Sequence, residues 1–342
     1  MGSASSVGHN FVQEEYRKQL AYTLEEEVAK HGVKKEVAGD IASKLYSKGA
    51  ELAREQSFVY RGTSTFVCAV DGSDASHLAF KATKLLLKKK DHICIFHAFK
   101  PELDEQKPAH MKSETIKHKY QTDLVGSFPS GKYSFLWEDK KDCQAKELII
   151  KLSDLYGQLN GGVKPEFLVL GYTGRKGIHK TEGATTIGST SDFALRSIHL
   201  PTILIKNEVP TGPKSYIMAI DESKNSKTGL DMIFPLIRPQ DSLTVIHIYD
   251  VENTAFGAQS EKDETAQYYE NELNEHAPTT NAKFHPIMKA AEGIAATINE
   301  YVNEIVPDFF CMAPRAQAEK GITSLTEKMI LELKCNIILC KH

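Results

Sequence analysis

The sequence lacks the long apolar runs that would identify a membrane protein. Its longest runs, such as 93–96 and 167–170, fall far short of the roughly 20 residues that a membrane-spanning helix needs. Residues 1–15 contain neither the basic nor the apolar segment of a signal peptide, so we expect no secretion. We therefore expect a cytoplasmic protein.

Positive and negative charges nearly balance in the sequence, and this balance argues against nucleic acids as partners. The 342 residues carry a formal net charge of −3, and 25% of them are charged. A nucleic-acid-binding domain usually shows a strongly basic surface or stripe. We therefore expect no nucleic-acid partner. At about 100–200 residues per domain, the length corresponds to two domains.

Paired cysteines and catalytic motifs are also missing. None of the six cysteines forms a C-x-x-C pair, and Cys68, Cys94 and Cys311 lie inside apolar runs. Buried, reduced thiols in a reducing compartment account for this distribution. The sequence has no Walker lysine, no catalytic-triad spacing and no H-E-x-x-H motif. We therefore expect ATP hydrolysis that is weak at most.

The N-terminal segment differs from the rest of the chain. Its start, MGSASS, fits the M-G-x-x-x-[ST] pattern for myristoylation of Gly2. A flexible N-terminus over residues 1–10 is the alternative. A single acyl chain would give only marginal, peripheral membrane binding.

Residues 11–57 show apolar positions mostly four and seven residues apart, which predicts a helical hairpin. We assign this helical extension to residues 11–60. Two interpretations of its apolar face remain open. It is either a cap that packs on the following domain or a docking element for another protein.

From residue 65, short apolar runs alternate with longer amphipathic segments. This pattern predicts βαβ units and a parallel sheet with helices on both faces. The predicted strands are 66–70, 93–99, 133–137, 166–172 and 202–206, and, after a Pro- and Gly-containing linker at 208–214, 216–221, 243–250, 283–288, 308–313 and 336–341.

The second set of strands repeats the first. Asp71 and His97 are 26 residues apart, and so are Asp221 and His247. The segment AVDGSDAS corresponds to AIDESKNS at an offset of 150 residues, which is too long for a solenoid repeat. The pattern predicts two copies of one α/β domain, at 65–207 and 215–342. The two histidines end corresponding strands, which indicates an inherited structural role.

Ligands of open parallel sheets bind beyond the carboxyl ends of the strands. Asp71 and Ser73 directly follow the first strand of the first copy. One interpretation is a turn followed by a helix cap. The other is that Asp71 accepts a hydrogen bond from a ribose hydroxyl. The sequence does not separate them.

Two glycine-containing segments point to a phosphate site. GYTG (171–174) follows the fourth strand, and Gly188-Ser189-Thr190 precedes the last helix of the first copy. Glycine lets the backbone approach a phosphate closely, and a helix N-terminus attracts anions. An ordinary Ser/Thr helix cap is the alternative interpretation of the second segment.

The motif order AVDGS, FHAF, VLGYTG and GSTSDFALRSIHLPTILI resembles the universal stress protein family over about residues 65–342. The resemblance implies two tandem, open, parallel five-stranded sheets of order 3-2-1-4-5, flanked by helices in an adenine nucleotide alpha hydrolase-like (Rossmann-like) fold. It also implies binding of ATP or AMP, with or without Mg²⁺, through G-x2-G-x9-G-[ST]. The implied ligand residues are Asp71 near the ribose, Ala98 and Leu170 beside the adenine, and Gly171, Gly174, Gly188, Ser189 and Thr190 around the phosphates. We also expect Ser73, next to Asp71, among the nucleotide-binding residues.

The phosphate motif departs from the family pattern in its spacing. Thirteen residues separate Gly174 from Gly188, where the family has nine. The longer loop carries Arg175, Lys176 and Lys180, which either contact a phosphate or face solvent. We expect nucleotide binding to survive because the helix N-terminus is intact.

The second copy has lost more of the motif. Ala313 and Ala316 replace glycines, and Thr323-Ser324 replaces Gly-Ser. A side chain at these positions would block close approach of a phosphate to the backbone. We therefore expect no nucleotide in the second copy.

In the family, the last strands of two domains often pair antiparallel. Here 202–206 and 336–340 are candidates for pairing within one chain, which would close two exposed sheet edges and give an intramolecular pseudo-dimer.

Two functions from different classes remain open. The first is an adenine-nucleotide-binding protein of signalling or stress response, with one live site. The second is a non-catalytic scaffold of a larger assembly, with a vestigial nucleotide site. The scaffold would use the helices at 11–57 and the polar segment 252–276 to bind proteins.

Overall fold

The computed structural model describes residues 63–139, 145–159, 164–174, 187–221, 223–250, 258–314 and 322–341. The chain divides into two compact units, Met1–Arg61 and Gly62–His342, and every described residue belongs to the second unit. The helical hairpin predicted at 11–57 and the predicted lipidation site Gly2 lie outside the described residues.

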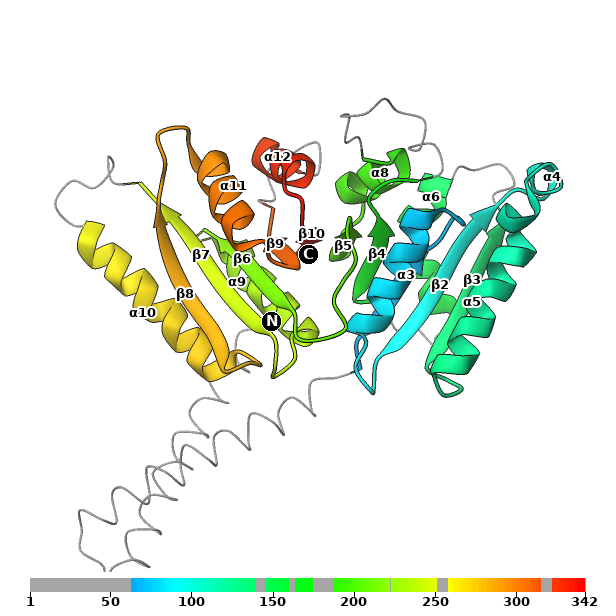
Figure 1. The fold of residues 1–342 in the computed structure, drawn as a ribbon, viewed down its shortest axis with the longest axis horizontal. Coiled ribbons are helices and arrows are strands. Elements are labelled where there is room, and N and C mark those ends of the chain that lie inside the picture. The colour runs from blue at the N-terminus through cyan, green and yellow to red at the C-terminus, as the bar shows by residue number, and fades with distance from the viewer. Residues whose placement is uncertain are drawn as a thin grey trace, which may run out of the picture. The chain divides into compact units, whose positions relative to one another are not determined.

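Strands and helices alternate along the second unit (Figure 1). The elements of its first half are β1 (Thr65–Ala69), α3 (Asp74–Leu86), β2 (His92–Phe99), α4 (Pro101–Asp104), η1 (Ala109–Met111), α5 (Ser113–Ser127), β3 (Tyr133–Asp139), α6 (Ala145–Ile150), α7 (Leu152–Leu159), β4 (Phe167–Gly171), α8 (Ser189–Ser197) and β5 (Thr202–Ile205).

The second half repeats this order with fewer helices among the described residues. Its elements are β6 (Ser215–Ile220), α9 (Lys224–Ile233), η3 (Phe234–Leu236), β7 (Ser242–Tyr249), α10 (Ala258–His276), β8 (Asn281–Met288), α11 (Ile294–Ile305), β9 (Phe309–Met312), α12 (Ser324–Glu332) and β10 (Asn336–Leu339). All the strands predicted from the sequence are confirmed, and their ends differ from the prediction by at most two residues.

The strands form one sheet of ten, in the order β3-β2-β1-β4-β5-β10-β9-β6-β7-β8. Neighbouring strands within each half are parallel and follow the expected 3-2-1-4-5 order. β5 and β10 run antiparallel, with Ile203 opposite Ile338. The predicted pairing of the last strands is therefore confirmed. It joins the two predicted sheets into one, and its outer edges are β3 and β8.

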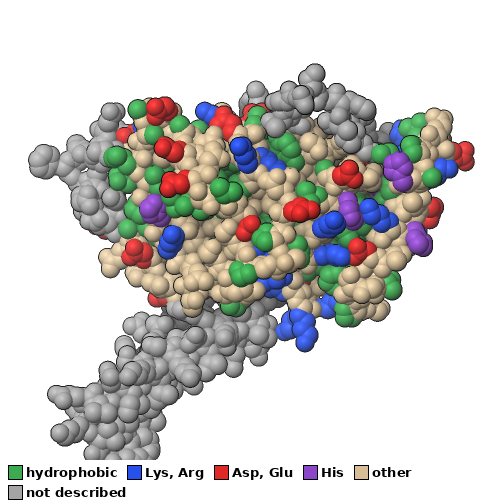
Figure 2. Space-filling view, viewed as in Figure 1, with side chains coloured by type: hydrophobic (Ala, Val, Ile, Leu, Met, Phe, Trp, Pro, Cys, Tyr) green, Lys and Arg blue, Asp and Glu red, His purple; other side chains and the backbone are tan. Residues whose placement is uncertain are grey.

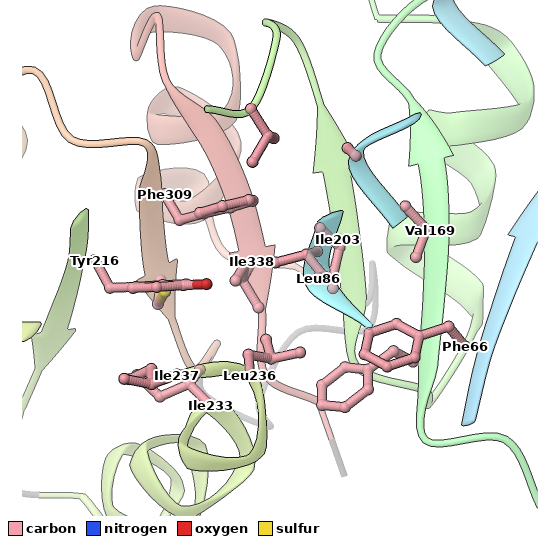
Figure 3. Packing of buried hydrophobic residues seen from close by; sticks show 14 of the residues in the cluster. Phe66, Leu86, Val169, Ile203, Tyr216, Ile233, Leu236, Ile237, Phe309 and Ile338 are labelled. Atoms are coloured by element: carbon pink, nitrogen blue, oxygen red, sulfur yellow. The ribbon is translucent and has the colours of Figure 1, made fainter. Parts of the chain in front are cut away.

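Helices cover both faces of the sheet because successive strand residues point to opposite sides. One core lies beneath α3, α5, α9 and α10, and the other lies beneath α6, α7, α8, α11 and α12. The first core runs across both halves (Figure 3). Phe66 stacks on Phe167 with ring centroids 5.0 Å apart, and the equivalent pair, Tyr216 and Phe309, is 5.1 Å apart.

Two lysines that follow the paired strands cap helices of the opposite half. Lys341, after β10, donates from Nζ to three carbonyl oxygens at the end of α8, at 2.7–3.2 Å. Lys206, after β5, donates from Nζ to two carbonyl oxygens at the end of α12, at 2.5 Å each. The acceptors are Ala194, Leu195 and Ile198 for Lys341, and Ile330 and Leu333 for Lys206.

Burial opposes the charge on both lysines, and the helix ends favour it. Desolvation lowers the pKa of Lys341 to about 7 and that of Lys206 to about 8. The carbonyl oxygens and the negative end of the helix dipole stabilise the ammonium form. These contacts reach carbonyl groups of the last helical turns, where partners inside a helix run out. Of the five acceptors, Ala194 O also accepts from Ile198 N at 3.1 Å.

A second reciprocal contact joins the halves on the opposite face of the sheet. Lys88 Nζ donates to the carbonyl oxygen of Ile237 at 2.9 Å. Arg238 Nη2 donates to the carbonyl oxygens of Leu85 and Leu87 at 2.8 and 2.9 Å. Lys88 and Arg238 are equivalent positions, 150 residues apart in the sequence. Each half thus supplies the donors for backbone groups of the other.

We predict that Lys341→Met lowers the free energy of unfolding by about 1–3 kcal/mol, because buried carbonyl oxygens lose their donor. Lys206→Met changes it in the same direction. Urea unfolding of the full chain measures both effects. The exposed Lys334 provides the control, and Lys334→Met stays within about 0.5 kcal/mol of the parent. Equal stability of the Lys341→Met and Lys334→Met proteins would contradict the capping role.

Candidate functional site

The candidate site lies at the carboxyl ends of β1 and β4. These strands are neighbours in the sheet, and the chain continues from β1 to β2 and β3 on one side and from β4 to β5 on the other. The strand order therefore reverses between β1 and β4, where open α/β sheets bind their ligands. Asp71 leaves β1 and Gly174 follows β4 at this point.

Asp71 and Ser73 build the turn from β1 into α3. Asp71 Oδ1 accepts hydrogen bonds from Ser73 N at 3.0 Å and from Ser73 Oγ at 2.6 Å. Ser73 Oγ also accepts from Ser76 N at 3.2 Å, which caps α3. Gly72 between them has a φ of +85°, a conformation that glycine adopts without strain. The hydroxyl of Ser73 is therefore engaged within the turn.

The second half builds the same turn without a phosphate motif. Asp221 Oδ1 accepts from Ser223 N at 3.1 Å and from Ser226 Oγ at 2.6 Å, and also from Ser223 Oγ. Ser223 caps α9 as Ser73 caps α3. The turn interpretation of Asp71 thus has direct support in both halves. Contact of Asp71 with a ribose remains a prediction.

Gly174 and Gly188 approach each other closely beside Asp71. A Cβ atom on Gly188 would lie 3.0 Å from Gly174 N, which is tighter than most contacts of real Cβ atoms. A Cβ atom on Gly174 would lie 3.5 Å from Asp71 Oδ2. Gly188 N also donates to the carbonyl oxygen of Tyr172 at 2.9 Å. Three motifs that are far apart in the sequence therefore meet in space.

Helix α8 begins at this meeting point, and its N-cap residue carries no side chain that could cap it. Its N-cap residue is Gly188. The first intrahelical hydrogen bond runs from Asp192 N to Gly188 O at 2.8 Å. The N–H groups of Ser189 and Thr190 precede this bond, so they have no acceptor inside the helix. Ser191 Oγ donates to the carbonyl oxygen of Gly171 at 2.8 Å and fixes the helix start to the end of β4. Such an N-terminus suits an anion.

Three of the predicted ligand residues have packing roles. Gly171 lies against α3, and a Cβ atom there would come within 2.6 Å of the carbonyl oxygen of Ala75. The side chain of Leu170 is buried in the core beneath α8. Ala98 is half-buried in β2, beside β1, and packs against the same core. Gly171 thus provides room for a helix, and nucleotide contact by these three residues remains a prediction.

The thirteen residues between Gly174 and Gly188 are largely outside the described part of the chain. Arg175, Lys176 and Lys180 all lie there. Their predicted alternatives, phosphate contact or solvent exposure, stay open.

The corresponding helix of the second half, α12, begins with a side-chain cap. Thr323 caps α12, because its Oγ1 accepts from Thr326 N at 3.2 Å. Asn225 Nδ2 donates to the carbonyl oxygen of Pro314 at 3.2 Å and connects α9 to the segment after β9. Helix α12 thus supplies its own N-terminal hydrogen bond where α8 has none from a side chain.

In the second half, the glycine that lets the helix pack closely on the sheet lies on the helix and not at the end of the strand. Ala313 replaces Gly171, and a Cβ atom on Gly229 of α9 would lie 2.8 Å from Ala313 Cβ. Glycine is therefore on the helix here and on the strand in the first half. Packing accounts for the absence of glycine at 313, whereas the cap of α12 is a difference at the helix start itself. Ala316 lies outside the described residues.

Two side chains that hold the site together, those of Ser76 and Ser191, were not predicted from the sequence. Ser76 Oγ accepts from Asp71 N at 3.3 Å, and Ser191 anchors α8. The pattern D-x-S-x-x-S occurs after the first strand of both halves and was the available signal for Ser76. His97 and His247 donate to the carbonyl oxygens of Val70 and Ile220, so the predicted structural role has direct support.

The cysteines have no reactive character in the part of the chain that the structure describes. Burial raises the pKa of Cys68 to about 12 and that of Cys94 to about 11. All five described cysteines are buried and unpaired, as predicted. Among the described residues, no group of three or more His, Cys, Asp or Glu side chains is arranged to hold a metal ion.

Comparisons with known proteins identify the fold. No family model and no curated protein sequence matches the chain. A universal stress protein from Archaeoglobus fulgidus DSM 4304 has a similar structure, with a TM-score of 0.54 and 16% identity over 82% of this chain and 97% of its own. A protein from Pseudomonas aeruginosa UCBPP-PA14 assigned to the same family has a TM-score of 0.55 and 12% identity over 82% of this chain and 93% of its own.

A third structure, a functionally unknown protein from Pseudomonas aeruginosa PAO1, has a TM-score of 0.54 and 13% identity over 82% of this chain and 92% of its own. Each comparison spans both halves of the sheet, because its coverage exceeds the length of either half. The strand order within each half is the one implied by the sequence resemblance. The chain therefore has the universal stress protein fold, in tandem.

Proposed function

We propose that this protein binds one adenine nucleotide, ATP or AMP, in its first half and acts in signalling or stress response without substantial turnover. The observation that carries the proposal is the approach of Gly174 and Gly188 beside Asp71, at the uncapped start of α8. A side chain on Gly188 would press against the backbone of Gly174, and one on Gly174 would lie against the Asp71 carboxylate. A phosphate has access there to backbone N–H groups, which is the usual chemistry of a helix N-terminal anion site.

The remaining ligand roles follow from the position of each residue around this point. The carboxylate of Asp71 accepts the ribose hydroxyls, Ser189 and Thr190 donate to phosphate, and the end of β2 at Ala98 faces the adenine. A Mg²⁺ ion would accompany the phosphates of ATP and be held mainly by them. Among the residues that the structure describes around this point, the contacts place no general base or water-orienting side chain, and this favours binding over hydrolysis.

The second half serves as a structural partner in this proposal. Residues 65–207 and 215–342 are two domains of common origin, linked by 208–214, and they form an intramolecular pseudo-dimer. Thr323 stands at the position of Gly188, so α12 begins with a side chain, and the Oγ1 atom of that side chain takes the N–H of Thr326. Only the first domain then binds a nucleotide.

We predict that calorimetry of the full chain with ATP and AMP detects one site, and that Gly188→Asp abolishes it. The new side chain would meet Gly174 and place a carboxylate at the phosphates. Like charges in contact cost several kcal/mol, so affinity falls at least about 100-fold. No binding to the unmodified chain would disprove the proposed function.

The duplication supplies a matched control for this variant. Thr323→Asp changes the equivalent position of the second half and keeps a good helix cap. We predict that it leaves nucleotide affinity and the stoichiometry of one per chain unchanged. A stoichiometry of two in the unmodified chain, reduced to one by Thr323→Asp, would show that the second site is live.

A scaffold function is the second candidate. In that case the nucleotide site is vestigial, and the helices predicted at 11–57 bind a protein partner.

On the face shown in Figure 2, basic and acidic side chains are interspersed, so its described residues form no continuous basic stripe of the kind that nucleic acids need.

No helix in the described ranges combines the length and apolarity needed to cross a membrane. Myristoylation of Gly2, with peripheral membrane binding, therefore remains a separate proposal. Mass spectrometry of the N-terminal peptide from the native source tests it.

A further inference from the structure

The peptide group between Val70 and Asp71 is held by side chains on both of its polar atoms. The carbonyl oxygen of Val70 lies 2.7 Å from His97 Nδ1. The amide N–H of Asp71 donates to Ser76 Oγ at 3.3 Å. This peptide is where the chain leaves β1, since Val70 N still donates to Phe96 O of β2 at 2.8 Å. Its orientation decides where the Asp71 carboxylate points.

The hydrogen bond from His97 has only one possible direction. A carbonyl oxygen accepts and never donates, so Nδ1 of His97 carries a proton. Nε2 lies 3.4 Å from Ser113 Oγ. Ser113 is itself fixed, because its N and its Oγ each donate to the Asp104 carboxylate at 2.8 Å.

The ring of His97 has little freedom to move. It is 0% exposed, lies 5.2 Å from the Trp137 ring and stacks parallel to Phe99 at 6.1 Å. Contacts from β3, α5 and the end of β2 thus hold the imidazole. Because the imidazole is immobile, it transmits its own position to the Val70 carbonyl group.

We propose that His97 is a positioning residue for the nucleotide site, which it serves by orienting Asp71 through the Val70 carbonyl group. The inference rests on the proposed function, because it assigns Asp71 to the ribose hydroxyls. The carboxylate discriminates nucleotides that carry both hydroxyls from those that lack them. That discrimination depends on the hydrogen bond from His97.

The second half contains the same clamp without a nucleotide site. His247 Nδ1 lies 3.3 Å from the carbonyl oxygen of Ile220, and Asp221 N donates to Ser226 Oγ at 2.9 Å. A histidine that acts only on stability has the same effect in either half. A histidine that positions a ligand group has its effect in the first half alone.

The test compares ATP with 2′,3′-dideoxy-ATP by calorimetry on the full chain. The unmodified protein binds ATP about tenfold more tightly than the dideoxy analogue, and this affinity ratio corresponds to one net hydrogen bond to a charged group. His97→Phe keeps an aromatic ring but removes the donor, so the ratio falls to about two or less. His97→Asn places an amide N–H near the former Nδ1 and restores most of the ratio. His247→Phe leaves the ratio unchanged.

Melting temperatures of the two Phe variants separate positioning from stability. Both variants lose a buried hydrogen bond and are destabilised, but only His97→Phe loses discrimination. If His97→Phe does not fold, Ser76→Ala removes the other bond to the same peptide, with Ser226→Ala as its control. The ratio then falls for Ser76→Ala and not for Ser226→Ala.

Two negative results have different meanings. If the unmodified chain binds ATP tenfold better than the dideoxy analogue and His97→Phe retains that ratio, the positioning role of His97 is overturned and the proposed function stands. If the unmodified chain binds no adenine nucleotide, the proposed function fails and the inference fails with it.

Discussion

The antiparallel pairing of β5 with β10 is the contact on which the rest of the molecule depends. It joins two parallel sheets and removes two strand edges that would otherwise be open to pairing with other chains. It also brings Lys206 and Lys341 to the far ends of the helices of the opposite half. The two halves therefore share backbone hydrogen-bond groups as well as a hydrophobic core.

This arrangement connects the second half to a site that it does not contain. Helix α8 carries Ser189 and Thr190 at its start, and Lys341 binds its last carbonyl oxygens. A short helix held at both ends is a rigid support for an anion site. The second half can thus lose its own phosphate motif and still contribute to the fold of the first.

The two halves also show which features belong to the fold and which to the site. The D-x-S-x-x-S turn and the histidine that binds the preceding carbonyl group occur in both halves. The glycine that separates strand from helix has moved from Gly171 to Gly229. The uncapped helix start at Gly188 has been replaced by the capping Thr323. Features kept by both halves serve the fold in each of them, and in the first half we propose a further role for Asp71 and His97. The difference at the helix start is the one that matters to an anion.

Sequence alone determined the strands, the duplication and the meeting of Asp71, Gly174 and Gly188. The strands are visible as apolar runs, and the duplication is visible as a repeat at an offset of 150 residues. The rule that ligands bind beyond the carboxyl ends of parallel strands then indicates which segments meet. Only the tertiary structure decided that Gly171 makes room for Ala75, that Ser76 and His97 clamp the peptide before Asp71, and that Lys341 caps α8. The physical reason is that one partner in each of these contacts is a backbone carbonyl or N–H group. Every residue carries one, so no side-chain pattern marks where a distant donor will find its partner.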